Sequence, residues 1–319
     1  MLPLVLALAL LALLPRPAHA ASRPLRIVAA ENFYGDIAAQ LAGPGAQVVS
    51  VLNNAAADPH LFEPGISTAR AVADADLVIY NGLSYDVWME KLLAGTRAPH
   101  RRIVVAASML AQRPPDGAKT DRDAPHRAAR FRNPHLWYDP AVIRGVARAI
   151  AAQLTEADPA GRARYDARLR RFLESMRSVD TEIARLRAHF SGTVVASTEP
   201  LAQYLTEAIG LTMSNERFQL SVMNGTEPSA RDTADFERAL RERRVRVLIY
   251  NGQVASSAVR RLLDIARESG IPVVGMTETE PPGVDYQQWM LDELRALGAA
   301  LQRVVPRSSA AENALRSRP

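Results

Sequence analysis

Two short segments of the chain present a histidine in nearly the same setting. Residues 58–62 read Asp-Pro-His-Leu-Phe and residues 133–137 read Asn-Pro-His-Leu-Trp. Proline restricts its own backbone and that of the residue before it, so each segment presents its histidine from a stiff, extended approach, while the Leu-aromatic pair can anchor in a core. A metal ligand needs such a fixed ring direction and an occupied second nitrogen. One such histidine is more simply structural, but two copies favour a metal site at His60 and His135.

The composition restricts which other groups could join these histidines. The chain has no cysteine, so disulfides, thiolate metal sites and cysteine nucleophiles are excluded, and any metal must be held by nitrogen and oxygen. The sequence contains no His-Glu-x-x-His, Gly-x-Ser-x-Gly, Walker or Gly-x-Gly-x-x-Gly motif. Protease, esterase, nucleotide and dinucleotide functions therefore have no motif support.

The N-terminus predicts export. Residues 1–14 are an unbroken apolar run, followed by Ala-His-Ala at 18–20, which is the pattern of a secretory signal peptide with its cleavage site. We expect residues 1–20 to be removed. No later segment has 18 consecutive apolar residues, so the mature chain is not expected to insert into a membrane. With no cysteine to carry a lipid anchor, a periplasmic location is expected.

The charge is basic but dispersed. The 39 Lys and Arg residues exceed the 34 Asp and Glu residues, giving a formal charge of +5, yet the arginines alternate with acids along helical segments. Aromatic residues make up only 6% of the chain, so no platform for stacking bases is visible. We expect a solvated arginine-rich surface and no nucleic-acid partner.

Strand-like and helix-like segments alternate along the mature chain, which is typical of an α/β fold with parallel sheets. The tetrapeptide Ile-Tyr-Asn-Gly occurs at 79–82 and again at 249–252, each time closing an apolar strand and opening a helical segment. This repeat indicates two similar lobes, each a parallel sheet flanked by helices, unless the match is chance. The predicted division is a signal peptide (1–20), an N-terminal metal-binding lobe (21–158), a linking helix (159–190) and a C-terminal metal-binding lobe (191–319).

The predicted linking helix is the most periodic segment of the chain. From Tyr165 to Phe190 apolar residues recur at alternating steps of four and three, with arginines and acids between them, and the Asp-Pro pair at 158–159 is a helix-start signal. A two-chain coiled coil would have the same stripe, but a helix packed across both lobes needs no partner. We therefore expect a monomer whose lobes are joined by one long rigid helix and close only slightly around a ligand. Residues 113–132, rich in Pro, Asp and Arg, are expected to form a loop.

These residues together resemble a known family. The Asp-Pro-His at 58–60 with Phe-Glu-Pro at 62–64, the Asn-Pro-His-Leu-Trp at 133–137, and Thr-Glu-Thr at 277–279 with Pro281 and Pro282 look like the periplasmic metal-binding receptors of zinc, manganese and iron ABC importers. The likeness covers essentially the whole mature chain. It implies a non-enzymatic substrate-binding protein that holds one divalent cation between its lobes. The cation is then passed to a membrane permease that an ATPase drives.

The resemblance carries four ligands onto this chain. His60 and His135 match the two histidines of the N-terminal lobe. The family's third ligand, a histidine or glutamate after the strand that follows the long helix, falls on Glu199; its alternative role is to cap the next helix. The fourth is an acid after the last strand, where Glu278 is preferred because Thr-Glu-Thr matches the family pattern, with Glu280 as the alternative. Both acids would lie at the carboxyl ends of parallel strands, where open α/β sheets bind ligands.

The identity of the metal and one competing function are left open by the sequence. Two imidazoles and two carboxylates favour Mn²⁺ or Fe²⁺, although Zn²⁺ accepts the same donors. The loop at 113–132 has one histidine, His126, where zinc receptors of the family often have many. Asn251 and Gln253 are candidates to hydrogen-bond a ligand carboxylate. The alternative function is an exported metal-dependent hydrolase with the same His-His-Glu core.

Overall fold

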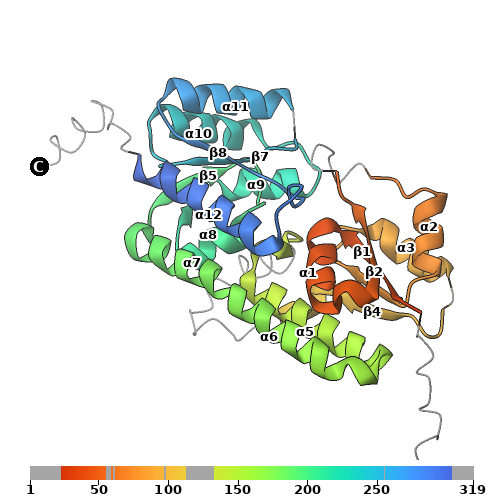
Figure 1. The fold of residues 1–319 in the computed structure, drawn as a ribbon. Coiled ribbons are helices and arrows are strands. Elements are labelled where there is room, and N and C mark those ends of the chain that lie inside the picture. Colours follow the sequence, from red (N-terminus) through yellow and green to blue (C-terminus); the bar gives the residue numbers. More distant parts are fainter. Residues whose placement is uncertain are drawn as a thin grey trace, which may run out of the picture.

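The computed structural model describes residues 23–54, 59, 62–96, 98–112, 133–254 and 256–303 (Figure 1). The predicted signal peptide, the loop at 113–132 with His126, and His60 lie outside the described residues. Within the described part of the chain, no helix is long and apolar enough to cross a membrane.

The first sheet forms the N-lobe, and all four of its strands are parallel in the order β2-β1-β3-β4. Its elements are β1 (Leu25–Glu31), α1 (Asn32–Ala42), β2 (Ala46–Leu52), α2 (Ile66–Ala73), β3 (Leu77–Tyr80), α3 (Val87–Gly95), β4 (Arg102–Val105) and α5 (Pro140–Ala157). Because side chains alternate along a strand, Ile27 and Ile79 pack in the core cluster that includes α1 and α5, whereas Val28 and Val78 pack with residues of α2 and α3.

The second sheet forms the C-lobe and repeats this plan in the order β6-β5-β7-β8, again all parallel. Its elements are β5 (Val194–Ser197), α8 (Gln203–Ile209), β6 (Thr212–Met213), α9 (Glu216–Met223), α10 (Ala230–Arg241), β7 (Leu248–Asn251), α11 (Ser257–Glu268), β8 (Val273–Met276) and α12 (Tyr286–Gln302). The repeated Ile-Tyr-Asn-Gly segments fall on β3 and β7, the third strands of the two sheets. The predicted α/β fold with two similar parallel sheets is confirmed.

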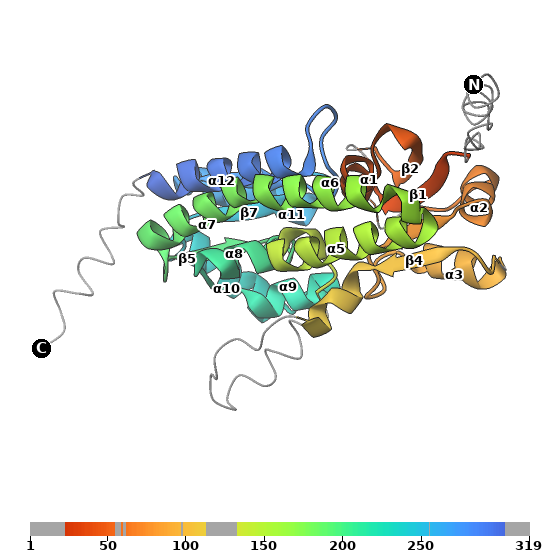
Figure 2. The same ribbon diagram turned by 60° about the horizontal axis from the view of Figure 1, so that its bottom comes forward.

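The linking helix runs along both lobes in two segments, α6 (Arg162–Ser175) and α7 (Arg177–Phe190) (Figures 1 and 2). Most of the predicted stripe is buried, including Phe172, Met176 and Leu186, and the rest is partly buried against the same core. The helix is interrupted at Met176, but the helical hydrogen bonds continue across it. The Met176 N–H donates to the Phe172 carbonyl at 3.1 Å, and the Asp180 N–H donates to the Met176 carbonyl at 3.2 Å. Near the interruption, the Ser175 hydroxyl donates to a carbonyl of the preceding turn, which competes with helical hydrogen bonds and bends helices.

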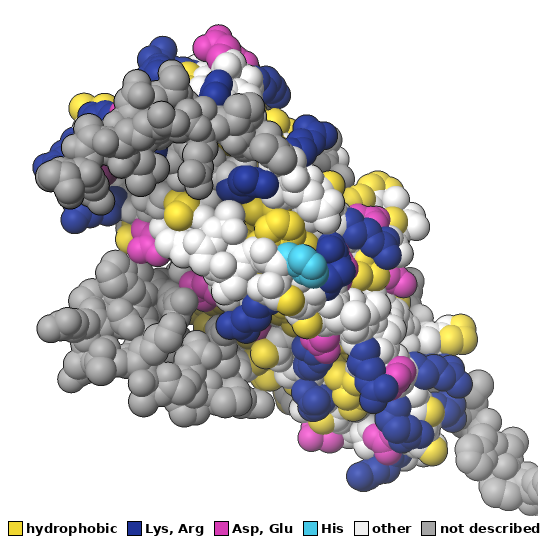
Figure 3. All heavy atoms as spheres, turned by 90° about the vertical axis from the view of Figure 1, so that its left-hand side faces the viewer, with side chains coloured by type: hydrophobic (Ala, Val, Ile, Leu, Met, Phe, Trp, Pro, Cys, Tyr) yellow, Lys and Arg dark blue, Asp and Glu magenta, His cyan; other side chains and the backbone are white. Residues whose placement is uncertain are grey.

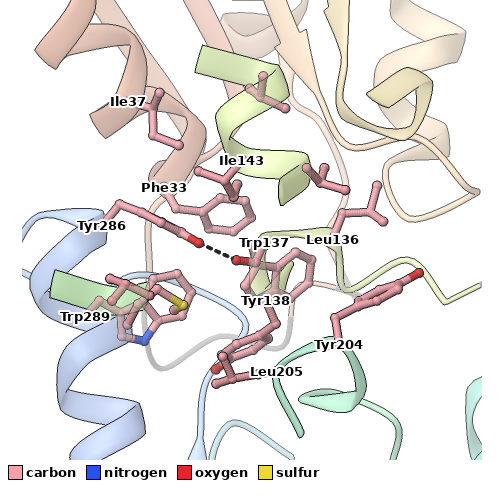
Figure 4. Packing of buried hydrophobic residues seen from close by; sticks show 14 of the residues in the cluster. Phe33, Ile37, Leu136, Trp137, Tyr138, Ile143, Tyr204, Leu205, Tyr286 and Trp289 are labelled. Carbon is pink, nitrogen blue, oxygen red and sulfur yellow. Dashed lines mark hydrogen bonds between the residues drawn. The ribbon is translucent and has the colours of Figure 1, made fainter. Parts of the chain in front are cut away.

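A single hydrophobic core reaches from one lobe into the other (Figure 4). Phe33 of α1 packs against Trp137, with ring centroids 5.0 Å apart, and against Trp289 of α12, at 5.8 Å. Tyr286 of α12 donates its hydroxyl to the carbonyl oxygen of Trp137 at 2.6 Å. Trp137 and Tyr138 are therefore core residues. Because the lobes share this core, their relative position is fixed by packing as well as by the linking helix.

The surface charge is dispersed, as the sequence predicts. On the face in Figure 3, Lys and Arg side chains are scattered among acidic and polar ones and do not merge into one basic patch. Several arginines pair with an acid three or four residues away on the same helix, for example Arg185 with Glu182 and Arg241 with Glu237. His100 and His189 are exposed, as expected for residues outside the site.

Candidate metal centre

Two of the candidate residues, His135 and Glu199, line a cavity of about 680 Å³ formed by residues of both lobes. Its described lining includes Tyr85, His135 and Glu199. Glu199 follows β5 and Glu278 follows β8, so both acids are placed at the carboxyl ends of C-lobe strands. Among the described lining residues there is no lysine or arginine, and Glu199 is the one carboxylate. Such a lining attracts a cation more than an anion.

His135 is held in one ring orientation by Asn133. The imidazole is 2% exposed, and its Nδ1 lies 2.6 Å from Asn133 Oδ1, which also accepts the backbone N–H of His135 at 3.0 Å. An amide oxygen can only accept, so Nδ1 carries the proton and Nε2 has the lone pair that a metal requires. The Asn133 amide nitrogen donates to the Pro200 carbonyl at 2.8 Å and to Gln203 Oε1 at 2.9 Å. Asn133 therefore ties the histidine to the C-lobe.

Glu278 faces His135 from the other side. Its carboxyl group is fully buried, and Oε2 lies 4.0 Å from His135 Nε2. Tetrahedral metal–ligand bonds of about 2.0–2.2 Å place two ligand atoms about 3.3–3.6 Å apart, so a shift of a few tenths of an ångström would bring both atoms into range of one ion. Both carboxyl oxygens accept hydrogen bonds: Oε1 from Asn251 Nδ2 at 2.5 Å and Oε2 from the Tyr85 hydroxyl at 2.7 Å.

The backbone of Glu278 is held as well. Its N–H donates to Gln253 Oε1 at 2.5 Å, and the backbone N–H of Gln253 donates to Asn251 Oδ1 at 2.9 Å. The prediction that Asn251 hydrogen-bonds a candidate ligand carboxylate is confirmed. Gln253 contacts the main chain of Glu278 rather than its carboxylate.

Glu199 lines the same cavity as His135 and is 9% exposed. The Ser197 hydroxyl donates to the Glu199 carbonyl at 2.6 Å, which fixes the turn after β5. The N-cap of α8 is Ala202, and no side chain caps this helix. Glu199 therefore does not cap α8, which was its alternative role.

Glu280, the alternative to Glu278, lies in a different environment. Asn32 Nδ2 donates to its carbonyl oxygen at 2.7 Å, and its N–H donates to Asn32 Oδ1 at 3.0 Å. Burial, together with the negative charges of Asp36 and Asp285, raises the pKa of the Glu280 carboxyl to about 9. Of the two acids, Glu278 is the one in contact range of His135.

Tyr85 is a site residue that the sequence reasoning missed. It comes from the N-lobe, yet its hydroxyl holds a C-lobe carboxyl. Burial and the charge of Glu278 raise the pKa of Tyr85 well above its usual value, so the hydroxyl keeps its proton and donates.

The turn before Tyr85 has two residues with left-handed backbone, Leu83 and Ser84, with φ of 54° and 62°. Asp86 stabilises this strained turn by accepting the N–H groups of Asn81 and Gly82 at 2.6 and 2.9 Å.

The asparagines of the repeated Ile-Tyr-Asn-Gly segment hold the candidate ligand segments in both lobes. Asn81 and Asn251 are its equivalent asparagines, and both are buried at the ends of equivalent strands. Asn81 Nδ2 donates at 2.8 Å to the carbonyl of Pro134, the residue before His135, while Asn251 Nδ2 donates to Glu278. Each lobe thus uses the same asparagine to position a candidate ligand segment.

The described residues do not by themselves complete a metal site. No three His, Asp or Glu side chains of the described ranges converge closely enough to hold an ion. His60, the fourth predicted ligand, lies outside those ranges. Among the described residues, the candidate site therefore consists of the pair His135 and Glu278, with Glu199 on the same cavity as His135.

Comparisons with known proteins identify the family of the chain. Residues 27–300 match the family described as ZnuA, zinc-uptake complex component A, periplasmic. The manganese ABC transporter substrate-binding lipoprotein PsaA of Streptococcus pneumoniae is 22% identical over 267 residues, covering 81% of each chain. The zinc-binding protein AdcA of Streptococcus pyogenes is 24% identical over 267 residues, which cover 78% of this chain and 51% of AdcA.

The fold has close counterparts among solved structures. The periplasmic zinc-binding protein TroA of Treponema pallidum superposes with a TM-score of 0.70 at 19% identity, covering 88% of this chain and all of TroA. At that identity the likeness establishes the fold. The family match extends from β1 to α12 and includes both sheets, His135, Glu199 and Glu278. Since it covers most of the sequence, the chain belongs to the ZnuA family of metal ABC transporter substrate-binding proteins, which are binding components and not enzymes.

Proposed function

We propose that this chain is an exported receptor that captures one divalent transition metal ion and delivers it to an ABC permease driven by an ATPase. The observation that carries the proposal is the 4.0 Å approach of His135 Nε2 to Glu278 Oε2 between the lobes, with the imidazole oriented by Asn133. Both groups have the donor chemistry of a transition-metal site, and a small shift would bring both into range of one ion.

The proposed ligands are His60, His135, Glu199 and Glu278. Two neutral imidazoles and two carboxylates would neutralise the charge of the ion. The choice of Glu278 over Glu280 is supported by the direction of the two side chains, since the Glu280 carboxyl is near Asp36 and Asp285. The choice of Glu199 is supported by its place on the same cavity as His135.

The proposed ion is Mn²⁺, Fe²⁺ or Zn²⁺. The donor types favour Mn²⁺ or Fe²⁺, but the named relatives include both a manganese and a zinc protein. Affinity alone favours zinc over manganese at most sites of this kind, so selection must depend on geometry and on supply.

The remaining parts of the proposal concern location and organisation. We propose that residues 1–20 direct export and are removed, that the mature chain works in the periplasm as a monomer, and that it divides into lobes 21–158 and 191–319 around the linking segment 159–190. The periplasmic and lipoprotein descriptions of the family and its relatives support an extracytoplasmic location. The hydrolase alternative is not retained, because the family consists of binding proteins.

The test is a metal-binding measurement on the mature chain, 21–319. After metal is removed with a chelator, calorimetric titration with Mn²⁺, Zn²⁺ and, without oxygen, Fe²⁺ should show one site. His135→Ala and His60→Ala should each weaken binding by orders of magnitude, because each removes a ligand. His189→Ala, which changes an exposed histidine, is the matched control and should bind like the wild type. Normal binding by His135→Ala would refute the assignment.

A further inference from the structure

We propose that Glu31 carries a proton at neutral pH and uses it to donate a hydrogen bond to Asp86, the residue that holds the turn between β3 and α3. Glu31 is the last residue of β1, and Asp86 directly precedes α3. Both lie in the N-lobe, and neither is among the proposed ligands. The inference rests on the proposed function only where it makes Glu31 a positioning residue for the segment of His135.

The carboxyl groups of Glu31 and Asp86 are buried side by side. Each residue is 0% exposed, and the two carboxyl groups lie at hydrogen-bonding distance from each other. Two ionised carboxylates cannot donate a hydrogen bond to each other, and their like charges repel strongly where water is absent. The arrangement is therefore stable when one member of the pair keeps a proton, which lies between the two groups.

The surroundings place this proton on Glu31. Asp86 accepts two backbone hydrogen bonds, from the N–H of Asn81 at 2.6 Å and from the N–H of Gly82 at 2.9 Å, and these favour its ionised form. No other described residue donates to either carboxyl oxygen of Glu31. Burial and the charge of Asp86 accordingly raise the pKa of Glu31 well above its usual value, whereas burial raises the pKa of Asp86 only to about 6.

The other titratable groups around this pair do not offset its charge. The pair interacts with the phenols of Tyr34 from α1, Tyr80 from β3 and Tyr85 from the turn. Each phenol has a raised pKa, because of burial and of the nearby carboxylates, and is uncharged at neutral pH. The proton shared by Glu31 and Asp86 therefore limits the pair to one negative charge.

The charged member of the pair supports one of the candidate ligand segments. Asp86 anchors the backbone of Asn81, and the Asn81 side chain is fixed by the Tyr34 hydroxyl, which donates to its Oδ1 at 2.7 Å. From this position Asn81 Nδ2 donates at 2.8 Å to the carbonyl of Pro134, the residue before the candidate histidine. By fixing the Asp86 carboxylate, Glu31 therefore acts on this segment through Asn81 without touching the ion.

The first measurement is infrared spectroscopy of the chain 21–319 with no metal added. A protonated carboxyl has a C=O stretching band that an ionised carboxylate lacks, so the spectrum of the wild type minus that of Glu31→Gln should contain this band at pH 7. Glu31→Met replaces the glutamine variant if that protein does not fold. A difference spectrum without the band means that Glu31 is ionised and overturns the inference. Failure of the wild type to bind metal would instead refute the proposed function, so the two failures are distinguishable.

The second measurement is the melting temperature as a function of pH. A carboxyl whose pKa is raised on folding binds its proton more tightly in the folded chain, so the chain loses stability as pH rises above the unfolded value, near 4.5. Glu31→Gln is neutral at every pH and still donates to Asp86, so its melting temperature relative to the wild type should rise between pH 5 and pH 9. The exposed Glu268→Gln is the control and should show no such rise. A difference that does not vary with pH would contradict the assignment of the proton to Glu31.

Metal affinity tests the positioning role. Glu31→Met has a side chain of similar length that cannot donate to Asp86, so its affinity for Zn²⁺ should fall by about tenfold, the lower end of the effects known for groups that orient metal ligands. Glu31→Gln restores a donor and should recover most of that loss. Equal affinities for the two variants, measured by calorimetry, would show that the positioning role of Glu31 is wrong.

Discussion

Asn32, the first residue of α1, satisfies both backbone groups of Glu280, a residue 248 positions later in the chain. Its Nδ2 donates to the Glu280 carbonyl oxygen at 2.7 Å, and its Oδ1 accepts the Glu280 N–H at 3.0 Å. One short side chain thus joins the N-lobe to the segment between Glu278 and α12. This contact lies close to the shared core, since the next residue along α1 is Phe33.

Replacing Asn32 with alanine should therefore destabilise the whole chain. Both backbone groups of Glu280 would lose their partner in a partly buried place, which costs about 1–3 kcal/mol for each group left unsatisfied and less where water can enter. Urea denaturation should show a lower midpoint. Asn224→Ala, an exposed asparagine, is the control and should change stability by no more than about 0.5 kcal/mol. Equal midpoints for the two variants would contradict the role of Asn32.

Asn133 should control metal affinity without touching the ion. Asn133→Ala removes the acceptor for His135 Nδ1–H, so the ring loses its fixed tautomer and direction; we expect affinity to fall by about 10–100-fold. Asn133→Asp retains an acceptor at the same place and should recover much of that loss. Calorimetry with Zn²⁺ measures both. If alanine and aspartate weaken binding equally, orientation of His135 is not the reason.

Glu199→His should shift preference from manganese towards zinc. Three imidazoles and one carboxylate form a softer donor set than two of each, and imidazole suits zinc better than manganese. Competition between Mn²⁺ and Zn²⁺ for one protein measures the shift, and Glu268→His, at an exposed position on α11, serves as the control. An unchanged preference would show that residue 199 does not bind the ion.

Glu293 should make stability depend on pH. Burial raises the pKa of its carboxyl to about 7, and the nearby charge of Asp292 acts in the same direction. The folded chain then binds more protons than the unfolded chain between the unfolded value, near 4.5, and about 7, so the free energy of unfolding falls as pH rises through that window. The full loss from a shift of this size is about 3 kcal/mol.

Glu293→Gln removes the ionisable group and retains an oxygen that can accept from Trp289 Nε1, which donates to Glu293 Oε1 at 3.2 Å. The variant should therefore melt at a higher temperature than the wild type at pH 8 and at nearly the same temperature at pH 4.5. Thermal unfolding at both pH values, with the exposed Glu268→Gln as the control, tests this. A gain of equal size at both pH values would point to packing rather than to charge.

Much of the fold could be predicted from the sequence, because its signals are local. The alternation of strand-like and helix-like segments and the apolar stripe from Tyr165 to Phe190 are read directly from neighbouring residues, and the two sheets and the helices α6 and α7 correspond to them. Helix α5 was not predicted, although Asp139 and Pro140 are a clear start signal: the Asp139 carboxylate accepts from Ala141 N–H at 2.9 Å. The interruption at Met176 was not predicted, because the apolar periodicity continues through it.

The site was predictable only in part, for a physical reason. Asn251 was found because it closes a strand beside the predicted ligands. Tyr85 was not, because its partner Glu278 is 193 residues away and belongs to the other lobe. Contacts between lobes depend on how the two sheets are set against each other, which no local pattern encodes. The placement of His60 stays a prediction.

The core shared by the two lobes has a consequence for how a transport partner could recognise its cargo. If packing around Phe33, Trp137 and Trp289 holds the lobes at a constant setting, the outline of the molecule hardly differs between its loaded and empty forms. Under the proposed function, a permease would then have to detect the bound ion through a small change at the mouth of the cavity. The turn at 83–84 is suited to convey it, because any redistribution of hydrogen bonds on Glu278 reaches Tyr85, the next residue along the chain.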